Sequence, residues 1–128
     1  MVLESHIADF STSFFKFRER AEAHKFSCNA TIETDYCSVY LRKHLTGVGE
    51  FDYHLCIGSI ELRPDLVGKG LFKAMIVFLE QNIGHFRAIE FESIMNPKLS
   101  DMLRKNGYTP SKHRENSIYS INLIKRIT

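Results

Sequence analysis

The sequence has little net charge and few cysteines. The sequence contains 17 Lys and Arg residues and 15 Asp and Glu residues, so its formal charge is +2 over 128 residues. A dedicated nucleic-acid-binding domain carries a much stronger basic excess, so the composition argues against a nucleic-acid partner. Cys28, Cys37 and Cys56 are odd in number and form no Cys-x-x-Cys pair. We therefore expect reduced thiols in the core or in strands rather than a disulfide framework or a zinc site.

Long apolar runs are absent as well. No segment approaches the length needed to span a membrane, and Glu4, His6 and Asp9 interrupt the first apolar stretch, unlike a signal peptide. These absences predict a cytoplasmic protein with no membrane partner. The six histidines are too scattered to predict a metal cluster, and no Ser-His-Asp or Cys-His constellation is visible. We also find no repeat, linker or low-complexity tract.

Apolar residues, in contrast, are plentiful. They make up 44% of the sequence and include ten Phe and five Tyr, which is ample for one core, so residues 1–128 are predicted to form a single domain. Residues 4–24 are predicted to form an amphipathic helix that lies on a sheet, because apolar residues recur there at steps of three and four. The residues of this stripe are Ile7, Phe10, Phe14, Phe17 and Ala21.

Residues 28–62 alternate between apolar and polar side chains, which predicts three antiparallel strands. Gly58, inside the third strand, indicates a bulge or a close backbone approach. Pro64 ends this strand, and an apolar helix follows the next glycines. The strand after that helix should run parallel to its predecessor, as in other strand-helix-strand crossovers. The expected strands are 28–33, 36–44, 51–62, 87–94 and 117–125, and the expected helices after the first are 70–83 and a short one between Asn96 and Gly107.

The sequence thus predicts an α/β (α+β) fold with a mixed, mostly antiparallel central sheet flanked by helices. Its most informative segment is the turn between residues 62 and 71. Gly68 and Gly70 allow the backbone to bend tightly there, and the following helix points its first N–H groups into the turn, as in phosphate-binding loops. The segment is not a Walker loop, and Lys73 stands where a Rossmann fingerprint needs its third glycine. Taken alone, such a glycine pair is more often simple loop geometry.

The order of elements over residues 53–124 resembles the GNAT superfamily of acyl-coenzyme A N-acyltransferases. The shared features are a strand, a Pro-x-x-x-Gly-Lys-Gly-Leu turn, an apolar helix, a strand, an Asn-led helix ending in Lys-Asn-Gly-Tyr, and a last strand. The resemblance implies acetyl-coenzyme A as co-substrate. In this family the glycine turn holds the pyrophosphate through main-chain N–H groups, and the strand before it splays from its neighbour so that pantetheine pairs with exposed backbone.

The resemblance also implies a set of cofactor-binding residues. Leu62 would offer its backbone to pantetheine, the turn would hold the pyrophosphate, and lysines at the positive end of the helix would meet phosphates or simply be solvated. The implied residues are Leu62, Val67, Gly68, Lys69, Gly70, Leu71, Phe72, Lys73 and Asn96.

Three positions depart from the family pattern. Val67 stands where the family usually has Arg or Gln, and Phe72 where it has Gly or Ala. Main-chain donation does not need Arg or Gln, but Phe72 must point away from the phosphates. Leu103 stands where many members carry a Tyr that protonates the departing thiolate, so another group or solvent must serve, or acylation is slow or absent. Tyr108 is predicted to belong to the core.

Transfer to an amine also needs a base, and the sequence offers four candidates: His54, Glu61, Glu90 and Glu92. Glu61 is next to the implied pantetheine position, and Glu92 lies near the carboxyl end of the next strand, where ligands of open sheets collect. Each candidate has a plainer interpretation, because acidic residues at alternate strand positions are usually solvent-facing and His54 could be a satisfied strand histidine.

Two hypotheses follow from the resemblance. The first is an N-acetyltransferase that moves an acetyl group from acetyl-coenzyme A to a primary amine, either a small molecule or a protein lysine or N-terminus, by direct attack in a ternary complex. The second is a catalytically weak or inactive protein of the same fold that acts as a macromolecular interaction module, which Leu103 and the altered turn favour.

The first helix or the last strand could pair with a second copy. Two basic clusters, residues 42–44 and 112–114, are interpreted as solvated.

Overall fold

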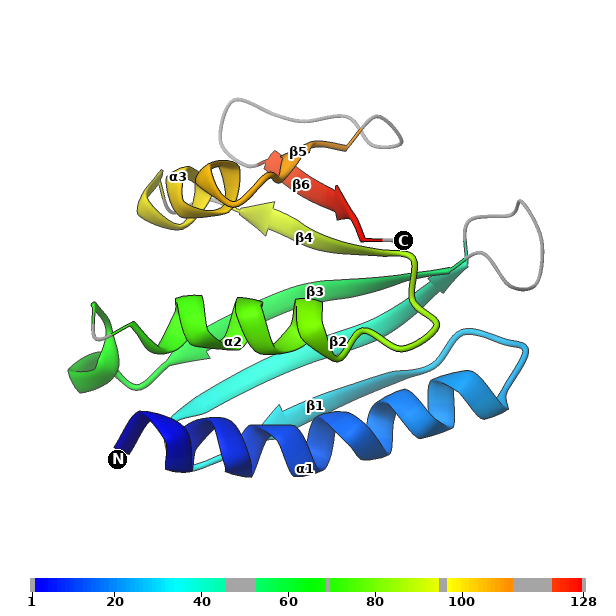
Figure 1. Ribbon diagram of the computed structural model, residues 1–128, viewed down its shortest axis with the longest axis horizontal. Helices are drawn as coiled ribbons and strands as arrows, with labels where there is room; N and C mark the ends of the chain where they lie inside the picture. The colour runs from blue at the N-terminus through cyan, green and yellow to red at the C-terminus, as the bar shows by residue number, and fades with distance from the viewer. Residues whose placement is uncertain (1, 46–52, 69, 95–96, 112–120, 128) are drawn as a thin grey trace.

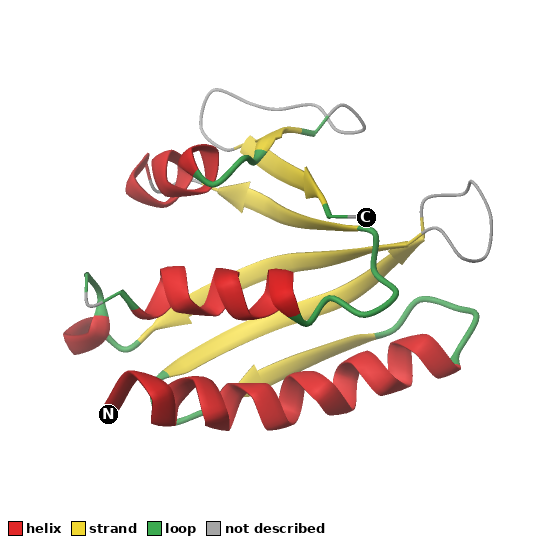
Figure 2. Cartoon of the chain, viewed as in Figure 1, coloured by secondary structure: helices red, strands yellow, loops and turns green. Residues whose placement is uncertain are grey.

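The computed structural model describes residues 2–45, 53–68, 70–94, 97–111 and 121–127. These residues form a six-stranded sheet with the strand order β1-β2-β3-β4-β6-β5 and three α-helices (Figures 1 and 2). The elements are α1 (Val2–Ala23), β1 (Asn29–Glu33), β2 (Cys37–Leu45), β3 (Tyr53–Leu62), α2 (Leu71–Gln81), β4 (Ala88–Ile94), α3 (Pro97–Lys105), β5 (Thr109–Pro110) and β6 (Ile121–Arg126), with a 3-10 turn at Pro64–Leu66.

The sheet is mixed and mostly antiparallel, as the sequence predicts. Among the described strands, only β3 and β4 pair in parallel, across the crossover made by α2, and every other neighbouring pair is antiparallel. The prediction missed β5, because two residues that include Pro110 carry no alternation to detect. The first residues of the expected strand 117–125 lie outside the described residues.

Gly58 forms a bulge, as predicted. Tyr40 pairs with Ser59 and Leu41 pairs with Ile57, so Gly58 is an extra residue in β3. A Cβ atom at position 58 would lie 2.6 Å from the Tyr40 ring, which explains why this position needs glycine. The bulge matters for the site described below, since a bulge bends its strand and increases the local twist.

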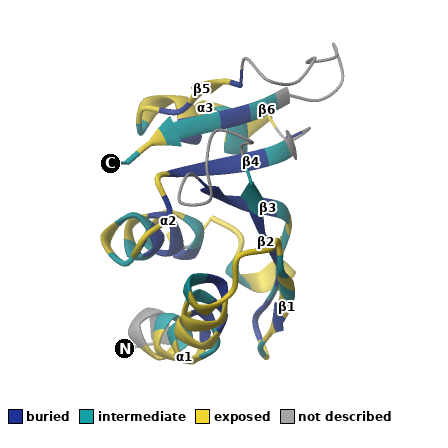
Figure 3. Ribbon diagram, turned by 90° about the vertical axis from the view of Figure 1, so that its right-hand side faces the viewer, coloured by how far each residue is buried: buried dark blue, intermediate teal, exposed yellow. Residues whose placement is uncertain are grey.

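Helices α1 and α2 cover the same face of the sheet (Figure 3). The Phe78 ring of α2 packs edge-on against Phe10 and Phe14 of α1, with centroid distances of 5.9 and 5.7 Å. The predicted apolar stripe of α1 is confirmed, because Phe10, Phe14, Phe17 and Ala21 are buried in the core and Ile7 packs against it. No helix among the described residues has both the length and the apolar character to cross a membrane.

The interpretation of residues 42–44 as a solvated basic cluster is wrong for Lys43. Its side chain is only 2% exposed, because strand alternation places it on the core face of β2 with Leu41. Its Nζ donates hydrogen bonds to the carbonyl oxygens of Ala21 (2.9 Å) and His24 (2.5 Å) and lies 4.3 Å from the Tyr53 ring centroid. Lys43 therefore satisfies the carbonyls at the C-terminal end of α1, where the helix dipole favours a cation. The cluster at residues 112–114 lies outside the described residues.

Tyr36, the residue before β2, is expected to make the stability of the fold depend on pH in the alkaline range. Its ring is buried and lies 4.2 Å from the His6 ring, and burial together with the adjacent Cys37 thiol raises its pKa to about 12. The unfolded chain, in which tyrosine titrates near 10, releases this proton first. The contribution of Tyr36 to the free energy of unfolding is thus complete below about pH 10 and is lost as the pH rises toward 12.

Urea unfolding of the wild type and Tyr36→Phe from pH 7 to 12 tests this expectation. We expect the variant to lose less free energy of unfolding than the wild type above about pH 10, with parallel profiles between pH 7 and 9. Coincident slopes above pH 10 would contradict it.

Candidate functional site

Strands β3 and β4 separate toward their carboxyl ends (Figure 1). They pair only where Leu55–Ile57 face Ile89–Phe91, although β3 continues to Leu62 and β4 to Ile94. Pairing ends at the Gly58 bulge, which bends β3 while β2 still follows it to Leu62. The result is a gap between two parallel strands at the carboxyl edge of the sheet, where open sheets bind ligands.

The backbone of Leu62 faces this gap. The Arg63 N–H donates to the Tyr36 carbonyl at 2.7 Å, so the main-chain groups of Arg63 point toward β2. Main-chain groups of successive strand residues point to opposite sides, and those of Leu62 therefore point away from β2 and toward β4. This direction suits a ligand that pairs with the main chain.

The glycine turn leads from the gap into α2. Gly68 and Gly70 have φ values of 82° and 84°, in the left-handed region that favours glycine. Gly70 is the N-cap of α2, without a hydrogen bond from a capping side chain, and no acidic residue stands in the first helical turn. A Cβ atom at either glycine would meet no described atom within 4 Å. Open space therefore surrounds a helix N-terminus whose N–H groups favour an anion.

The first two side chains of α2 are apolar and pack into the core. Leu71 is buried, and the Phe72 ring packs against the core with its centroid 6.0 Å from that of Phe91. The Phe72 side chain is thus directed at the core. Val67 is 63% exposed. Lys69 and Asn96, two of the predicted cofactor-binding residues, lie outside the described residues.

A basic cavity of about 450 Å³ lies between α2 and α3. Lys73 of α2 faces it together with Lys98 and Lys105 of α3, and Asp101, Met102 and Asn106 complete the lining. Lysines grouped beside a helix N-terminus suit phosphate oxygens. Sequence reasoning found Lys73 from its place in the turn but missed Lys98 and Lys105, because only the tertiary fold brings α3 to the same cavity.

The candidate bases share one face of the sheet, opposite α1. His54 and Glu90 are buried there, and the Cys56 thiol donates to Glu90 Oε1 at 3.6 Å. Glu92 is the first residue of β4 beyond the paired segment, and Arg42 Nη2 lies 2.9 Å from both of its carboxylate oxygens. Glu61 is exposed at the far end of β3 on the same face. The sheet register thus places Glu92 at the start of the gap, Glu90 and His54 deeper in the sheet, and Glu61 at the outer end of the gap.

Leu103 and Tyr108 both belong to the core. Leu103 is fully buried, and Tyr108 is confirmed as a packing residue, since its ring lies 5.5 Å from that of Phe91. The Tyr108 hydroxyl donates to Glu80 Oε2 at 2.9 Å, and burial together with this carboxylate raises the pKa of Tyr108 far above its usual value. Tyr108 is therefore held by α2 and keeps its proton at neutral pH.

No family model and no curated protein matches the sequence. Solved structures do match. A presumed acetyltransferase from Agrobacterium tumefaciens has a TM-score of 0.54 and 16% identity, with 96% of this chain and 91% of that chain covered. A presumed GNAT-family acetyltransferase from Desulfovibrio desulfuricans has a TM-score of 0.51 and 16% identity, with 76% and 66% covered. A chain of the KacTA-DNA complex has a TM-score of 0.50 and 10% identity, with 79% and 67% covered.

This chain is shorter than several of the proteins it resembles. It spans about two thirds of the Desulfovibrio and KacTA chains and 56% of the AtaT toxin, which aligns with a TM-score of only 0.45. At these identities the likeness shows the fold alone.

Proposed function

We propose that this chain, which has the fold of the GNAT acetyltransferases, binds acetyl-coenzyme A and transfers its acetyl group to a primary amine. The observation that carries the proposal is the gap between β3 and β4, which opens beside the left-handed glycine turn at the N-terminus of α2. One extended ligand with an amide-containing arm and a pyrophosphate could occupy both features.

The chain's own groups suit the two parts of such a ligand. In the proposal, the main-chain N–H and C=O of Leu62 pair with the pantetheine amides in the gap. Main-chain N–H groups of residues 67–72 hold the pyrophosphate, which needs no side chain from Val67. Lys73, Lys98 and Lys105 supply positive charge to the phosphates from the adjoining cavity.

The proton transfers are assigned to the polar face of the sheet. Acetyl-coenzyme A, when bound, supplies an activated thioester, and the amine must lose a proton to attack it. Glu92 stands at the start of the gap and is oriented by Arg42, Glu61 stands at the outer end, and His54 lies deeper in the sheet. We propose these three as the groups that accept the proton, directly or through water. Because Leu103 has no proton to donate, protonation of the thiolate is left to solvent or to another group.

Thermal unfolding with and without acetyl-coenzyme A tests cofactor binding. A ligand that binds only the folded state at a hundred times its Kd adds ~2.7 kcal/mol, which for a chain of this size raises Tm by roughly 10 °C. We expect such a rise at millimolar acetyl-coenzyme A and a much smaller one with acetate or phosphate alone. An unchanged Tm would remove the basis of the proposal.

Release of free thiol from acetyl-coenzyme A separates the two hypotheses. For an N-acetyltransferase we expect release that depends on an added amine, tested with small amines and with lysine-containing peptides. Binding without release across all of these acceptors would instead favour the interaction module. The buried Leu103, which cannot donate a proton, is the observation that favours this second function.

A further inference from the structure

The outer edge of β1 offers main-chain groups to a further strand. Strand β1 stands at one end of the sheet and pairs only with β2 among the described strands (Figure 1). Lys43 N–H donates to the Cys28 carbonyl at 2.8 Å and Thr34 N–H to the Cys37 carbonyl at 2.9 Å. Even-numbered residues of this segment therefore point their main-chain groups toward β2. By alternation, those of Asn29, Thr31 and Glu33 point outward.

Helix α1 confirms this direction independently and adds positive charge. The Arg20 guanidinium donates to the Asn29 carbonyl, a bond that only an outward-pointing carbonyl can accept from α1. Natural proteins often place charged side chains along an exposed sheet edge, where they prevent unwanted pairing. Here the Arg20 guanidinium binds the Asn29 carbonyl, at the start of β1. The edge beyond it, at Thr31 and Glu33, remains open to pairing.

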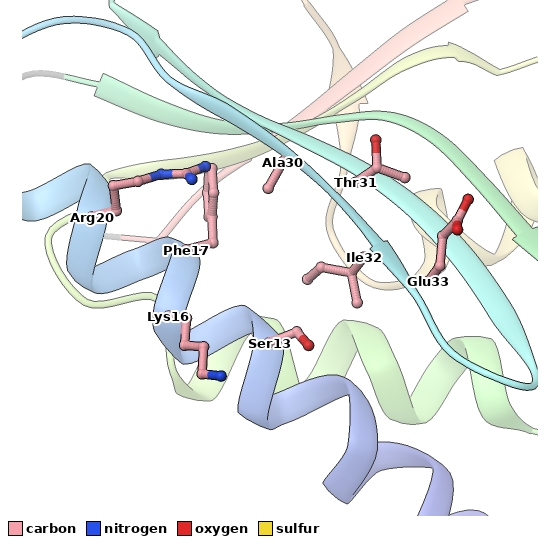
Figure 4. Close-up of a pocket in the computed structure, with 8 residues that line it drawn as sticks. All are labelled: Ser13, Lys16, Phe17, Arg20, Ala30, Thr31, Ile32 and Glu33. Atoms are coloured by element: carbon pink, nitrogen blue, oxygen red, sulfur yellow. The ribbon is translucent and has the colours of Figure 1, made fainter.

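A cavity of about 590 Å³ runs between α1 and this edge. Its lining comes from two elements, Ser13, Lys16, Phe17 and Arg20 of α1 and Ala30, Thr31, Ile32 and Glu33 of β1. Figure 4 shows Ala30 and Ile32 directed toward α1, whereas Thr31 and Glu33 are directed to the other face of the sheet. On the helix side of the cavity, the charged lining residues are therefore Lys16 and Arg20, both exposed.

We propose that this edge binds an extended acidic segment of a partner protein as a seventh strand. Its main chain pairs with Thr31 and Glu33, and alternate side chains enter the cavity beneath α1. Side chains opposite Ala30 and Ile32 point into that space, where carboxylates meet Lys16 and Arg20. Backbone pairing supplies affinity and the charged cavity supplies selectivity, as in other cases of strand addition.

Charge complementarity favours an acidic partner over a second copy of the chain. Two β1 edges paired antiparallel in one sheet would place both α1 helices on the same side of it. Lys16 and Arg20 of the two copies would then face each other across the seam, and such like-charge pairs are unfavourable at an interface.

The test uses two fluorescent heptapeptides, one of alternating threonine and glutamate and one of alternating threonine and lysine, both capped at their ends. We expect the glutamate peptide to bind at low salt and the lysine peptide to bind at least fivefold more weakly. Lys16→Glu, whose carboxylate offsets the charge of Arg20, should abolish this preference, while Lys25→Glu, an exposed lysine outside the cavity, should retain it. Amide resonances of Thr31 and Glu33 should shift and become protected from exchange on binding.

Thr31→Pro provides a backbone control. Proline removes an N–H that points outward, so the ladder with β2 is retained, and we expect peptide binding to fall at least tenfold with an unchanged circular dichroism spectrum. Thr31→Ala should bind like the wild type. The proposal is overturned if neither peptide binds the wild type, if Lys16→Glu leaves the preference unchanged, or if the shifted amides lie elsewhere. It is also overturned if a concentration-dependent dimer of the wild type is dispersed by Thr31→Pro, since a second copy then occupies the edge.

Discussion

Gly70→Asp is expected to weaken acetyl-coenzyme A binding about a hundredfold, which would abolish the thermal shift at accessible ligand concentrations. Gly70 caps α2 with a φ of 84°, and open space surrounds its position. An added carboxylate would therefore stand in the space proposed for the pyrophosphate. Repulsion between charges a few ångströms apart at a protein surface costs about 2–3 kcal/mol, which corresponds to this loss. Titration calorimetry with acetyl-coenzyme A measures it directly.

Gly70→Asn is the matched control, because asparagine has nearly the same shape as aspartate without its charge. Asparagine also tolerates the left-handed region better than most residues. We expect Gly70→Asn to lose only about tenfold in affinity from strain and crowding. Equal losses for the two variants would show that an anion is not bound at the turn, and unchanged affinity in both would place the cofactor elsewhere.

Lys43→Met is expected to lower the free energy of unfolding by about 2–4 kcal/mol. Methionine can replace the apolar stem of Lys43, so the cavity left behind is small, but it cannot donate to the carbonyls of Ala21 and His24. Hydrogen bonds from a charged donor contribute about 1.5–3 kcal/mol each, and part of this gain is offset because the ammonium no longer has to be buried. Urea unfolding monitored by circular dichroism measures the difference.

Lys16→Met is the control for this prediction, because Lys16 is an exposed lysine on α1. An exposed lysine remote from buried partners is expected to change stability by less than about 0.5 kcal/mol. If Lys43→Met were as stable as Lys16→Met, the buried ammonium would not be anchoring the end of α1 to β2.

Local patterns predicted most of the elements of the sheet and helices. The apolar stripe of α1 and the bulge at Gly58 were both readable, since each is set by spacing or by a single residue type. The burial of Lys43, in contrast, could not be predicted from local patterns. Its partners are carbonyls at the end of a helix about twenty residues earlier, and a sequence shows no donor-acceptor geometry across that separation.

The candidate site also contains residues that the sequence identified and residues that only the structure brought together. Position in the turn identified Gly68, Gly70 and Lys73, and only the tertiary fold brought Lys98 and Lys105 to the same cavity as Lys73. Among the four candidate bases, position along the strands favoured Glu61, beside the implied pantetheine residue, and Glu92, near the carboxyl end of its strand. The sheet register then distinguished them, because it pairs Glu92 with Arg42, buries His54 and Glu90, and leaves Glu61 exposed.

The sequence by itself determined where the chain can bend. Glycine is needed wherever φ is positive or a Cβ has no room, and strand and helix periods follow from which side chains must leave water, so the left-handed turn and the α/β order were fixed locally. Only the tertiary structure decided that β3 and β4 part beside that turn, and that β1 carries an open edge next to a basic cavity. Both features depend on strand order and register, which arise from packing between distant segments rather than from any local preference.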